Sequence, residues 1–204
     1  MYGDFMKLTK ESRNAILSTI LGDGYLTKSG GGEIKHCLAQ LDFLTWKVRF
    51  LRSVGVKCSE PRLIGNSGYD GCYAYINSTK WGKVLRRVLY KNGYKNIYNR
   101  KLLNRLNAKH IAIWYMDDGG LSKKKKNGVV HGNELFLNTH TTKENNQVLI
   151  DYFSEVWGVK FGQVKNRGHY RLRCGTIEAR KFLNIVREYV IQVPSMAHKI
   201  DIKS

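Results

Sequence analysis

The pattern of apolar and polar positions in this chain predicts one order of elements that occurs twice. In the first half, a helix from about Thr9 to Leu21 precedes two strands, a helix capped by Asp42, two more strands and a helix that begins at Ser78 or Thr79. The predicted strands are Tyr25–Ser29, Glu33–Leu41, Val56–Ile64 and Tyr69–Asn77.

The same order returns in the second half of the chain. The predicted elements are a helix ending at Asp118, strands Leu121–Lys126 and Glu134–His140, a helix at Lys143–Trp157, strands Val159–Lys165 and His169–Cys174, and a last helix that carries Phe182, Leu183 and Val186. We therefore divide the chain into an N-terminal repeat at 1–94, a basic connector at 95–108 and a C-terminal repeat at 109–204.

This duplication predicts an α+β fold built from two αββαββα repeats. Two repeats are too few for a solenoid, so we expect a closed pair about a pseudo-twofold axis. The four strands of each repeat should form one antiparallel sheet, with one face on the helices and the other face open.

Two apolar segments that end in Asp-Gly occupy similar places in the two repeats. They are Ile16–Gly24 (ILSTILGDG) and Ile111–Gly119 (IAIWYMDDG). Each reads as a buried helix that stops at a left-handed glycine, which places Asp23 and Asp118 at helix C-termini. A carboxylate is unfavourable there because the partial charge is already negative. A bound Mg²⁺ between the two helix ends would explain both acids, whereas either segment alone is more simply a capped core helix.

The charge of the chain narrows the class of partner. A formal net charge of +19 and a pI near 9.9 favour a polyanion as the partner. No apolar run is long enough to span a bilayer, and the first ten residues lack the apolar core of a signal peptide, so we expect an intracellular protein without a membrane partner. The cysteines have no CxxC spacing and are expected to be free thiols, with a pairing of Cys58 and Cys72 left open.

The open faces of the sheets carry the candidate contacts to this polyanion. Along His169–Cys174, His169, Arg171 and Arg173 should share the face opposite Tyr170 and Leu172, where they could read bases or phosphates. The run of lysines at 123–126 is either a solvated strand edge or a set of phosphate contacts. Further candidates are Lys35, Lys57, Tyr73, Tyr75, Lys123, Lys124, Lys125, Lys165 and the turn residue Arg167.

The two Asp-Gly segments resemble the nine-residue motif of the LAGLIDADG homing endonucleases. In that family the metal-binding acid is the eighth residue, which is Asp23 or Asp118 here, and the resemblance implies that Gly22 and Asp117 supply further oxygen ligands. The chain departs from the motif at the sixth position, with Leu21 and Met116, and has a large third residue in the second motif, Ile113.

Further segments also resemble this family. Lys95-Asn96-Ile97-Tyr98 and Pro194–Lys199 are similar to segments that place a basic residue near each active site, with tyrosine and histidine as departures; the alternative is two ordinary exposed lysines. Leu137–His140 resembles a strand end whose polar side chains hold water near the cleaved phosphate. The resemblance thus implies catalytic roles for Lys95, Lys199, His140 and its counterpart Gln40, and a DNA contact for Asn138.

The resemblance implies a site-specific double-strand DNA endonuclease. It would put the motif helices at the interface of the repeats, with two sheets forming a saddle on DNA. The enzyme would use Mg²⁺ (Mn²⁺ or Ca²⁺ can occupy the site), act as a monomer on a long asymmetric target, and leave short 3′ overhangs. An intron RNA maturase, with structured intron RNA as partner, and a non-cleaving DNA-binding regulator are alternatives on the same fold. The implied setting is a bacterial or archaeal cytoplasm, or a eukaryotic organelle or nucleus, and an intron-encoded or free-standing gene rather than an intein.

Overall fold

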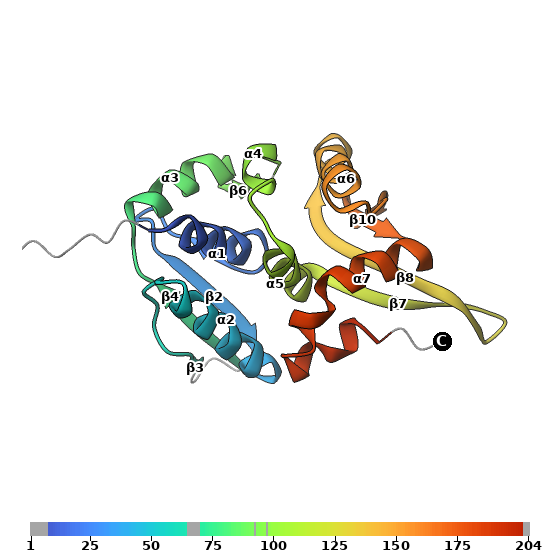
Figure 1. Ribbon diagram of the computed structural model, residues 1–204, viewed down its shortest axis with the longest axis horizontal. Coiled ribbons are helices and arrows are strands. Elements are labelled where there is room, and N and C mark those ends of the chain that lie inside the picture. Colours follow the sequence, from blue (N-terminus) through green and yellow to red (C-terminus); the bar gives the residue numbers. More distant parts are fainter. Residues whose placement is uncertain (1–7, 65–69, 92, 97, 202–204) are drawn as a thin grey trace, which may run out of the picture. The chain divides into compact units, whose positions relative to one another are not determined.

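A computed structural model describes residues 8–64, 70–91, 93–96 and 98–201. The chain divides into two compact units, Met1–Lys95 and Asn96–Ser204 (Figure 1). The boundary falls at the start of the predicted connector. None of the described helices has a stretch long and apolar enough to cross a lipid bilayer.

The first unit contains a four-stranded antiparallel sheet in the order β1-β2-β4-β3. Helix α2 contacts β2 and β4, and α1 contacts α2. A short β5–β6 ribbon ends the unit. The elements are α1 (Lys10–Leu21), β1 (Tyr25–Leu26), β2 (Gly32–Cys37), the 3-10 helix η1 (Leu38–Gln40), α2 (Leu41–Ser53), β3 (Arg62–Ile64), β4 (Gly71–Ile76), α3 (Lys80–Leu89), β5 (Tyr90–Lys91) and β6 (Tyr94–Lys95).

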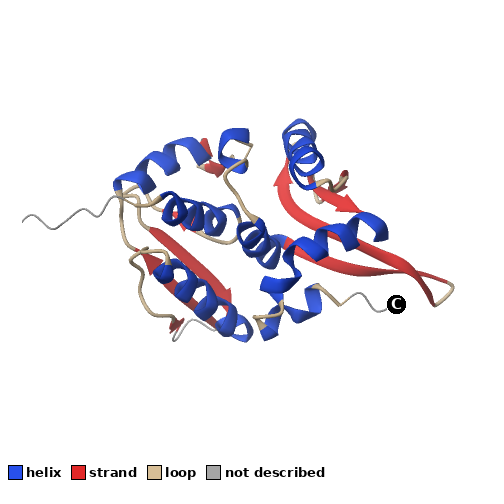
Figure 2. Cartoon of the chain, in the orientation of Figure 1, coloured by secondary structure: helices blue, strands red, loops and turns tan. Residues whose placement is uncertain are grey.

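The second unit has a sheet of the same kind in the order β7-β8-β10-β9. Helices α6 and α7 contact its strands, and α5 packs on α7. The elements are α4 (Arg100–Leu103), α5 (Ala108–Asp118), β7 (Gly119–Lys126), β8 (Val129–Thr141), α6 (Lys143–Trp157), β9 (Gly162–Asn166), β10 (His169–Cys174), α7 (Thr176–Val190) and the 3-10 helix η2 (Pro194–Lys199). The matching strand orders confirm the predicted duplication of helix, two strands, helix, two strands, helix (Figure 2).

Local sequence explains where several elements begin and turn. The Thr9 side chain caps α1 by accepting a hydrogen bond from the Ser12 amide, and Asn107 opens α5 with a capping box. The β7–β8 hairpin turns at Asn127-Gly128, where both residues have positive φ, as a two-residue hairpin loop of this type requires. All four cysteines are described and are free thiols, as expected.

The first unit corrects several predicted boundaries. The predicted strand Glu33–Leu41 ends at Cys37, because Leu38–Gln40 form a 3-10 turn. Helix α2 therefore has Gln40 rather than Asp42 at its N-cap, and the Asp42 carboxylate accepts from the neighbouring Phe43 amide instead. The predicted strand Tyr25–Ser29 shortens to Tyr25–Leu26, because Thr27 turns the chain through bonds to Gly31.

The remaining strand predictions differ mainly in length. Of Val56–Ile64 only Arg62–Ile64 is strand, preceded by an isolated bridge at Cys58, and Tyr69–Asn77 reduces to β4, with Tyr69 outside the described residues. Strand β8 is longer than predicted at both ends, and β9 begins at Gly162 rather than Val159. The predicted turn at residues 65–68 also lies outside the described residues.

The glycines of the two motif segments are required by close packing and not by a left-handed cap. Gly119 has an extended backbone with φ −81°, so the predicted left-handed conformation is wrong. A Cβ atom there would clash with the Tyr115 ring, and one at Gly24 would lie 2.6 Å from the Thr19 carbonyl oxygen. Helix α1 also ends at Leu21, so Asp23 lies just beyond the helix, whereas Asp118 is the last residue of α5.

Candidate metal and nucleic-acid site

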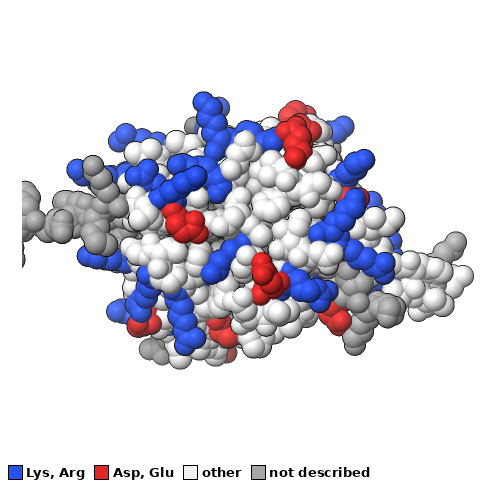
Figure 3. All heavy atoms as spheres, in the orientation of Figure 1, with Lys and Arg blue, Asp and Glu red and all other residues white. Residues whose placement is uncertain are grey.

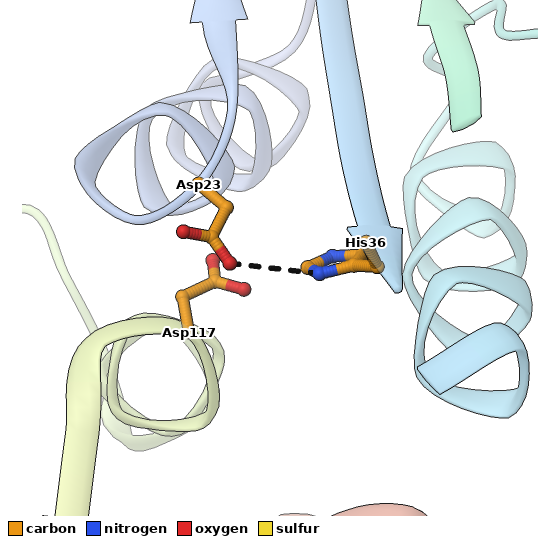
Figure 4. Close-up of side chains that lie close together, drawn as sticks. All are labelled: Asp23, His36 and Asp117. Atoms are coloured by element: carbon orange, nitrogen blue, oxygen red, sulfur yellow. Dashed lines mark ion pairs between the residues drawn. The ribbon is translucent and has the colours of Figure 1, made fainter. Parts of the chain in front are cut away.

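In the first unit, the chain leaves α1 in a tight turn that presents Asp23. The Gly24 amide donates to the Thr19 carbonyl at 3.0 Å, which holds the turn. The Asp23 side chain remains 43% exposed, and its Oδ2 lies 3.5 Å from Nδ1 of His36 on β2 (Figure 4). An exposed carboxylate beside a helix end offers the hard oxygen donors that Mg²⁺ binds.

A lysine reaches the same helix end from the β5–β6 ribbon. Lys95 pairs with Tyr90 across this ribbon, and the Tyr90 hydroxyl accepts from the Leu26 amide at 3.1 Å. The ribbon thereby brings the Lys95 ammonium to the Gly22 carbonyl, to which it donates a hydrogen bond. The carbonyl named by the motif as a metal ligand is thus also the acceptor of the predicted basic residue.

The second unit ends its motif helix with two adjacent acids, Asp117 and Asp118, both half-buried. Trp114 Nε1 donates to Asp118 Oδ2 at 3.1 Å, one turn back along α5. The Asn138 amide on β8 donates to the Asp118 backbone carbonyl at 2.9 Å. These bonds fix the end of α5 against β8, one of the two interior strands of the sheet. Figure 4 labels Asp117 at the end of this helix.

In the second unit, Lys199 contacts the end of the motif helix, as Lys95 does in the first unit. Its ammonium donates to the Met116 carbonyl, and the Asp117 carbonyl lies 3.3 Å away. The Tyr115 hydroxyl donates to the Lys199 carbonyl at 2.6 Å, which ties η2 to α5. Lys199 is only 8% exposed. A cation at this position offsets the negative end of the helix next to the acids.

Gln40 and His140, the two polar residues predicted at strand ends, lie in different surroundings. Gln40 is half-buried at the N-cap of α2. His140 is exposed and has a φ of 45°, in an irregular stretch of β8 between the pairs Leu137–Leu172 and Thr141–Tyr170. Irregularities of this kind redirect side chains and are common beside active sites.

Sequence reasoning missed His36 and Lys47. His36 shares the helix-facing side of β2 with Ile34 and is 4% exposed, and Lys47 on α2 is fully buried. Lys47 Nζ lies 3.1 Å from His36 Nε2. The sequence did contain a signal for His36, because this histidine occupies an apolar position of the alternating strand that follows the first motif.

The open face of the first sheet is aromatic. Register places Lys35 opposite Tyr73, and Glu33 opposite Tyr75, with Arg62 also opposite Tyr73. Glu33 and Lys35 form an ion pair at 3.0 Å, and the two tyrosine rings pack edge to face. Lys57 is exposed but lies outside the strands. The face thus offers flat rings with a small cluster of charge around them.

The open face of the second sheet carries Arg171 and Arg173, and contacts within the protein hold both side chains in place. Arg173 donates through Nε to Glu134 at 2.6 Å, and Lys124 makes a second ion pair with the same carboxylate at 2.6 Å. The Arg171 guanidinium lies 3.8 Å from the centre of the Phe136 ring. Such stacking and pairing fix the direction in which a guanidinium points.

The remaining predicted contacts lie around this sheet. Lys165 is opposite Tyr170 in the β9–β10 register, so it lies on the helix side and not on the open face as predicted. Lys123 is opposite the buried Asn133, and Lys124 lies on the open face. Arg167 has a positive φ in the β9–β10 turn. All of these predicted contacts are exposed, namely Lys123, Lys124, Lys125, Lys165, Arg167 and His169. On the face drawn in Figure 3, basic side chains also outnumber acidic ones.

A comparison with protein-family models shows which family the chain belongs to. The model described as the LAGLIDADG DNA endonuclease family matches residues 13–182. The chain belongs to this family. The match includes both Asp-Gly segments and most of both units, and it ends before η2, which carries Lys199.

Curated relatives of this LAGLIDADG protein are distant. It is 24% identical to the protein RecA of Mycolicibacterium flavescens over 212 residues, which cover 95% of this chain and 47% of RecA. It is 27% identical over 107 residues to probable intron-encoded DNA endonuclease 3 of Mycosarcoma maydis, which is 52% of this chain and 72% of that protein. The chain spans about half the length of the RecA relatives it matches.

The fold also has a solved counterpart. The homing endonuclease I-WcaI bound to its DNA recognition sequence superposes with a TM-score of 0.81 at 21% identity, covering 98% of this chain and 89% of that one. This likeness confirms the predicted fold class.

Proposed function

We propose that this protein is a site-specific endonuclease of double-stranded DNA that requires a divalent metal ion, Mg²⁺ in the cell. The observation that carries the proposal is the same arrangement in both units. In each, a lysine from outside the motif donates to a carbonyl in the last turn of the motif helix or just after it, immediately before an acid. Membership of the LAGLIDADG DNA endonuclease family supports this reading.

The acids of the two units have the chemistry of a magnesium site. Asp23 in the first unit and Asp118 in the second occupy the eighth motif position, and Asp117 adds a neighbouring carboxylate. Their donors are oxygens, which Mg²⁺ prefers. When bound, the metal activates water and stabilises the leaving oxygen of the phosphodiester.

The chain's own residues orient these acids. The Trp114 indole fixes the direction of the Asp118 carboxylate, and Asn138 fixes the backbone that carries it. Lys95 and Lys199 hold the carbonyls beside the acids and place positive charge near the site of phosphate cleavage. His140 and Gln40 are the candidates for holding water near that phosphate.

The two open sheet faces are the proposed contacts to the target. Arg171 and Arg173 are suited to guanine edges in the major groove, and the exposed lysines around them to phosphates. The first unit would contribute Lys35, Tyr73 and Tyr75. One half-site for each unit in a single chain implies a monomer on an asymmetric target of roughly two helical turns.

The test is cleavage of a plasmid library of randomised sites in Mg²⁺, followed by assays on the site that is selected. Asp23→Asn, Asp117→Asn and Asp118→Asn remove one charge each with little change in shape. We expect Asp23→Asn and Asp118→Asn to abolish cleavage of at least one strand at unchanged specific binding, and Asp117→Asn to weaken it less. Ca²⁺ should support binding without cleavage.

Two outcomes would change this conclusion. Normal double-strand cleavage by either Asp23→Asn or Asp118→Asn would remove the metal assignment. Specific binding of DNA without cleavage by the wild-type chain in Mg²⁺ or Mn²⁺ would indicate a regulator, and specific binding of intron RNA alone a maturase.

A further inference from the structure

A line of three side chains in the first unit begins at the proposed metal acid and ends in the core. Asp23 Oδ2 lies 3.5 Å from His36 Nδ1 (Figure 4). On the other side of the ring, His36 Nε2 lies 3.1 Å from Lys47 Nζ. His36 and Lys47 are buried. Lys47 also lies 4.2 Å from the centre of the Phe43 ring, which packs on His36.

A charged Lys47 would decide which ring nitrogen of His36 carries the proton. A lysine ammonium has three donors and no acceptor. The His36 Nε2 atom beside it must therefore present a lone pair, and in a neutral imidazole the proton is then on Nδ1. That N–H is directed at the Asp23 carboxylate.

We infer that His36, oriented by Lys47, is a positioning residue for Asp23. Its Nδ1–H holds the carboxylate of the exposed turn after α1, where the backbone alone would leave the side chain several rotamers. The inference rests on the proposed function of Asp23 as a metal ligand. It follows the general rule that ligand carboxylates are oriented by partners outside the metal shell.

The same geometry argues against His36 as a metal ligand. Ligation through Nδ1 requires the lone pair that the Nδ1 proton occupies. The unprotonated atom, Nε2, lies against the Lys47 ammonium in the buried interior. His36 thus differs from a histidine whose free nitrogen is presented to a metal site.

The two units orient their acids by different means as a result. Asp118 receives its side-chain bond from Trp114, a residue of its own helix. Asp23 has no indole at the same distance along α1, where the residue four positions earlier is Thr19, whose hydroxyl donates to the Ala15 carbonyl. Loss of His36 should therefore slow only the strand that the first unit cleaves.

A pair of near-isosteric variants separates the two sides of the imidazole. His36→Asn keeps a donor close to the position of Nδ1, and His36→Gln keeps a polar group close to the position of Nε2. On a supercoiled plasmid carrying the selected target, we expect His36→Gln to accumulate nicked circles, with one strand cut at least about 10-fold more slowly. His36→Asn should retain a faster second cut than His36→Gln.

A measurement without DNA or metal tests the tautomer directly. In ¹⁵N-histidine-labelled wild-type protein, His36, assigned by its loss in the His36→Asn spectrum, should show a protonated Nδ1 and an unprotonated Nε2. Lys47→Met should shift this nitrogen pattern toward the Nε2–H tautomer. Thermal unfolding of each variant checks that the first unit is folded.

The outcomes are separable from those of the proposed function. A protonated Nε2 in the wild-type protein, or equal cleavage of both strands by His36→Gln, would overturn the inference. If Asp23→Asn cleaved normally, the proposed function of Asp23 would fail even with the expected tautomer. A His36→Gln variant that unfolds leaves Lys47→Met, with the nitrogen spectrum and strand ratio as its two readouts.

Discussion

Lys199 donates its ammonium hydrogen to the backbone carbonyl of Met116, in the last turn of α5. The side chain is charged and almost completely buried, so favourable contacts must offset the free energy of its desolvation. The carbonyls at a helix C-terminus are unpaired acceptors with partial negative charge, and a buried cation satisfies them. Lys95 does the same for the Gly22 carbonyl in the other unit.

We predict that Lys199→Met lowers both stability and cleavage. The variant leaves the Met116 carbonyl without its charged donor, which should cost about 1–3 kcal/mol in the free energy of unfolding. Loss of positive charge beside the acids should slow cleavage of one strand by at least about 10-fold. Urea unfolding and the ratio of nicked to linear plasmid measure the two effects.

Lys95→Met and Lys101→Met serve as comparison and control. Lys95→Met should slow the other strand, because it belongs to the first unit. Lys101 is an exposed lysine on α4, so its replacement should change neither strand ratio nor unfolding by more than a few tenths of a kcal/mol. Slowing of the same strand by Lys95→Met and Lys199→Met would contradict a one-lysine-per-unit arrangement.

A second prediction concerns the indole that holds Asp118. Trp114→Phe keeps an aromatic ring in the stack with Phe153 and removes only the N–H donor with part of the ring. One lost hydrogen bond is worth about 1 kcal/mol, so cleavage by the second unit should fall roughly 3- to 10-fold. Single-turnover cleavage of end-labelled strands measures this, and equal slowing of both strands would point to a global packing defect instead.

The lysines and acids could be predicted from the sequence because their signals are local. Asp23 and Asp118 end short apolar runs, and Lys95 and Lys199 stand in recognisable short segments. The partners that orient them come from elsewhere in the chain. His36 meets Asp23 only once β2 lies beside the turn after α1, and spacing in the sequence does not encode that contact.

The face that a strand residue occupies can be predicted only where the alternation along the strand is clear. Along β10 the alternation is regular, so the sequence predicts Arg171 and Arg173 together on the open side. Lys165 lies on the opposite, helix-facing side, because β9 pairs Lys165 with Tyr170. The alternation of residues along β9 alone does not reveal this pairing. The ion pair of Arg173 with Glu134 was not predicted, because the two residues lie on different strands.

The stability of the second unit should depend on pH through His110. This histidine lies at the start of α5, where its Nδ1 accepts from the Asn107 amide at 3.1 Å in the capping box. Burial, with a smaller effect of the Lys109 charge, lowers the pKa of His110 from 6.5 to about 4. Protonation would place a charge in the core and remove the acceptor from the cap.

The sign of the effect follows from the lowered folded-state pKa. The unfolded chain binds this proton more readily, so the contribution of neutral His110 is complete above about pH 6.5 and is lost as pH falls toward 4. A shift of this size corresponds to a loss on the order of 3 kcal/mol. Urea unfolding between pH 7.5 and 4.5 should show this loss, and His110→Asn should flatten the curve whereas the exposed His131→Asn should not. An unchanged slope in His110→Asn would assign the acid sensitivity to other groups.

The last prediction concerns Glu134, an acid on the open face of a strongly basic protein. Its carboxylate holds Arg173 and Lys124 together, so it neutralises part of the charge that would otherwise bind phosphates. A negative group next to DNA weakens binding to every sequence, but it also fixes where the arginine points. We therefore expect Glu134 to trade affinity for selectivity.

Glu134→Gln should bind all DNA sequences more tightly and discriminate among them less. The net charge of the face rises by one, so the slope of log K against log [salt] should become steeper by about one. Arg173→Ala should instead cost about 1–3 kcal/mol on the selected target and relax the preference at one or two base pairs. Binding-site selection and titrations at two salt concentrations measure both effects. Glu155→Gln is the matched control, because Glu155 lies on α6, away from the open sheet face, and pairs with Arg100 on α4. If Glu134→Gln kept the wild-type base preferences and salt slope while Arg173→Ala lost affinity for every sequence alike, Arg173 would be a phosphate contact and its ion pair with Glu134 would have no part in reading the target.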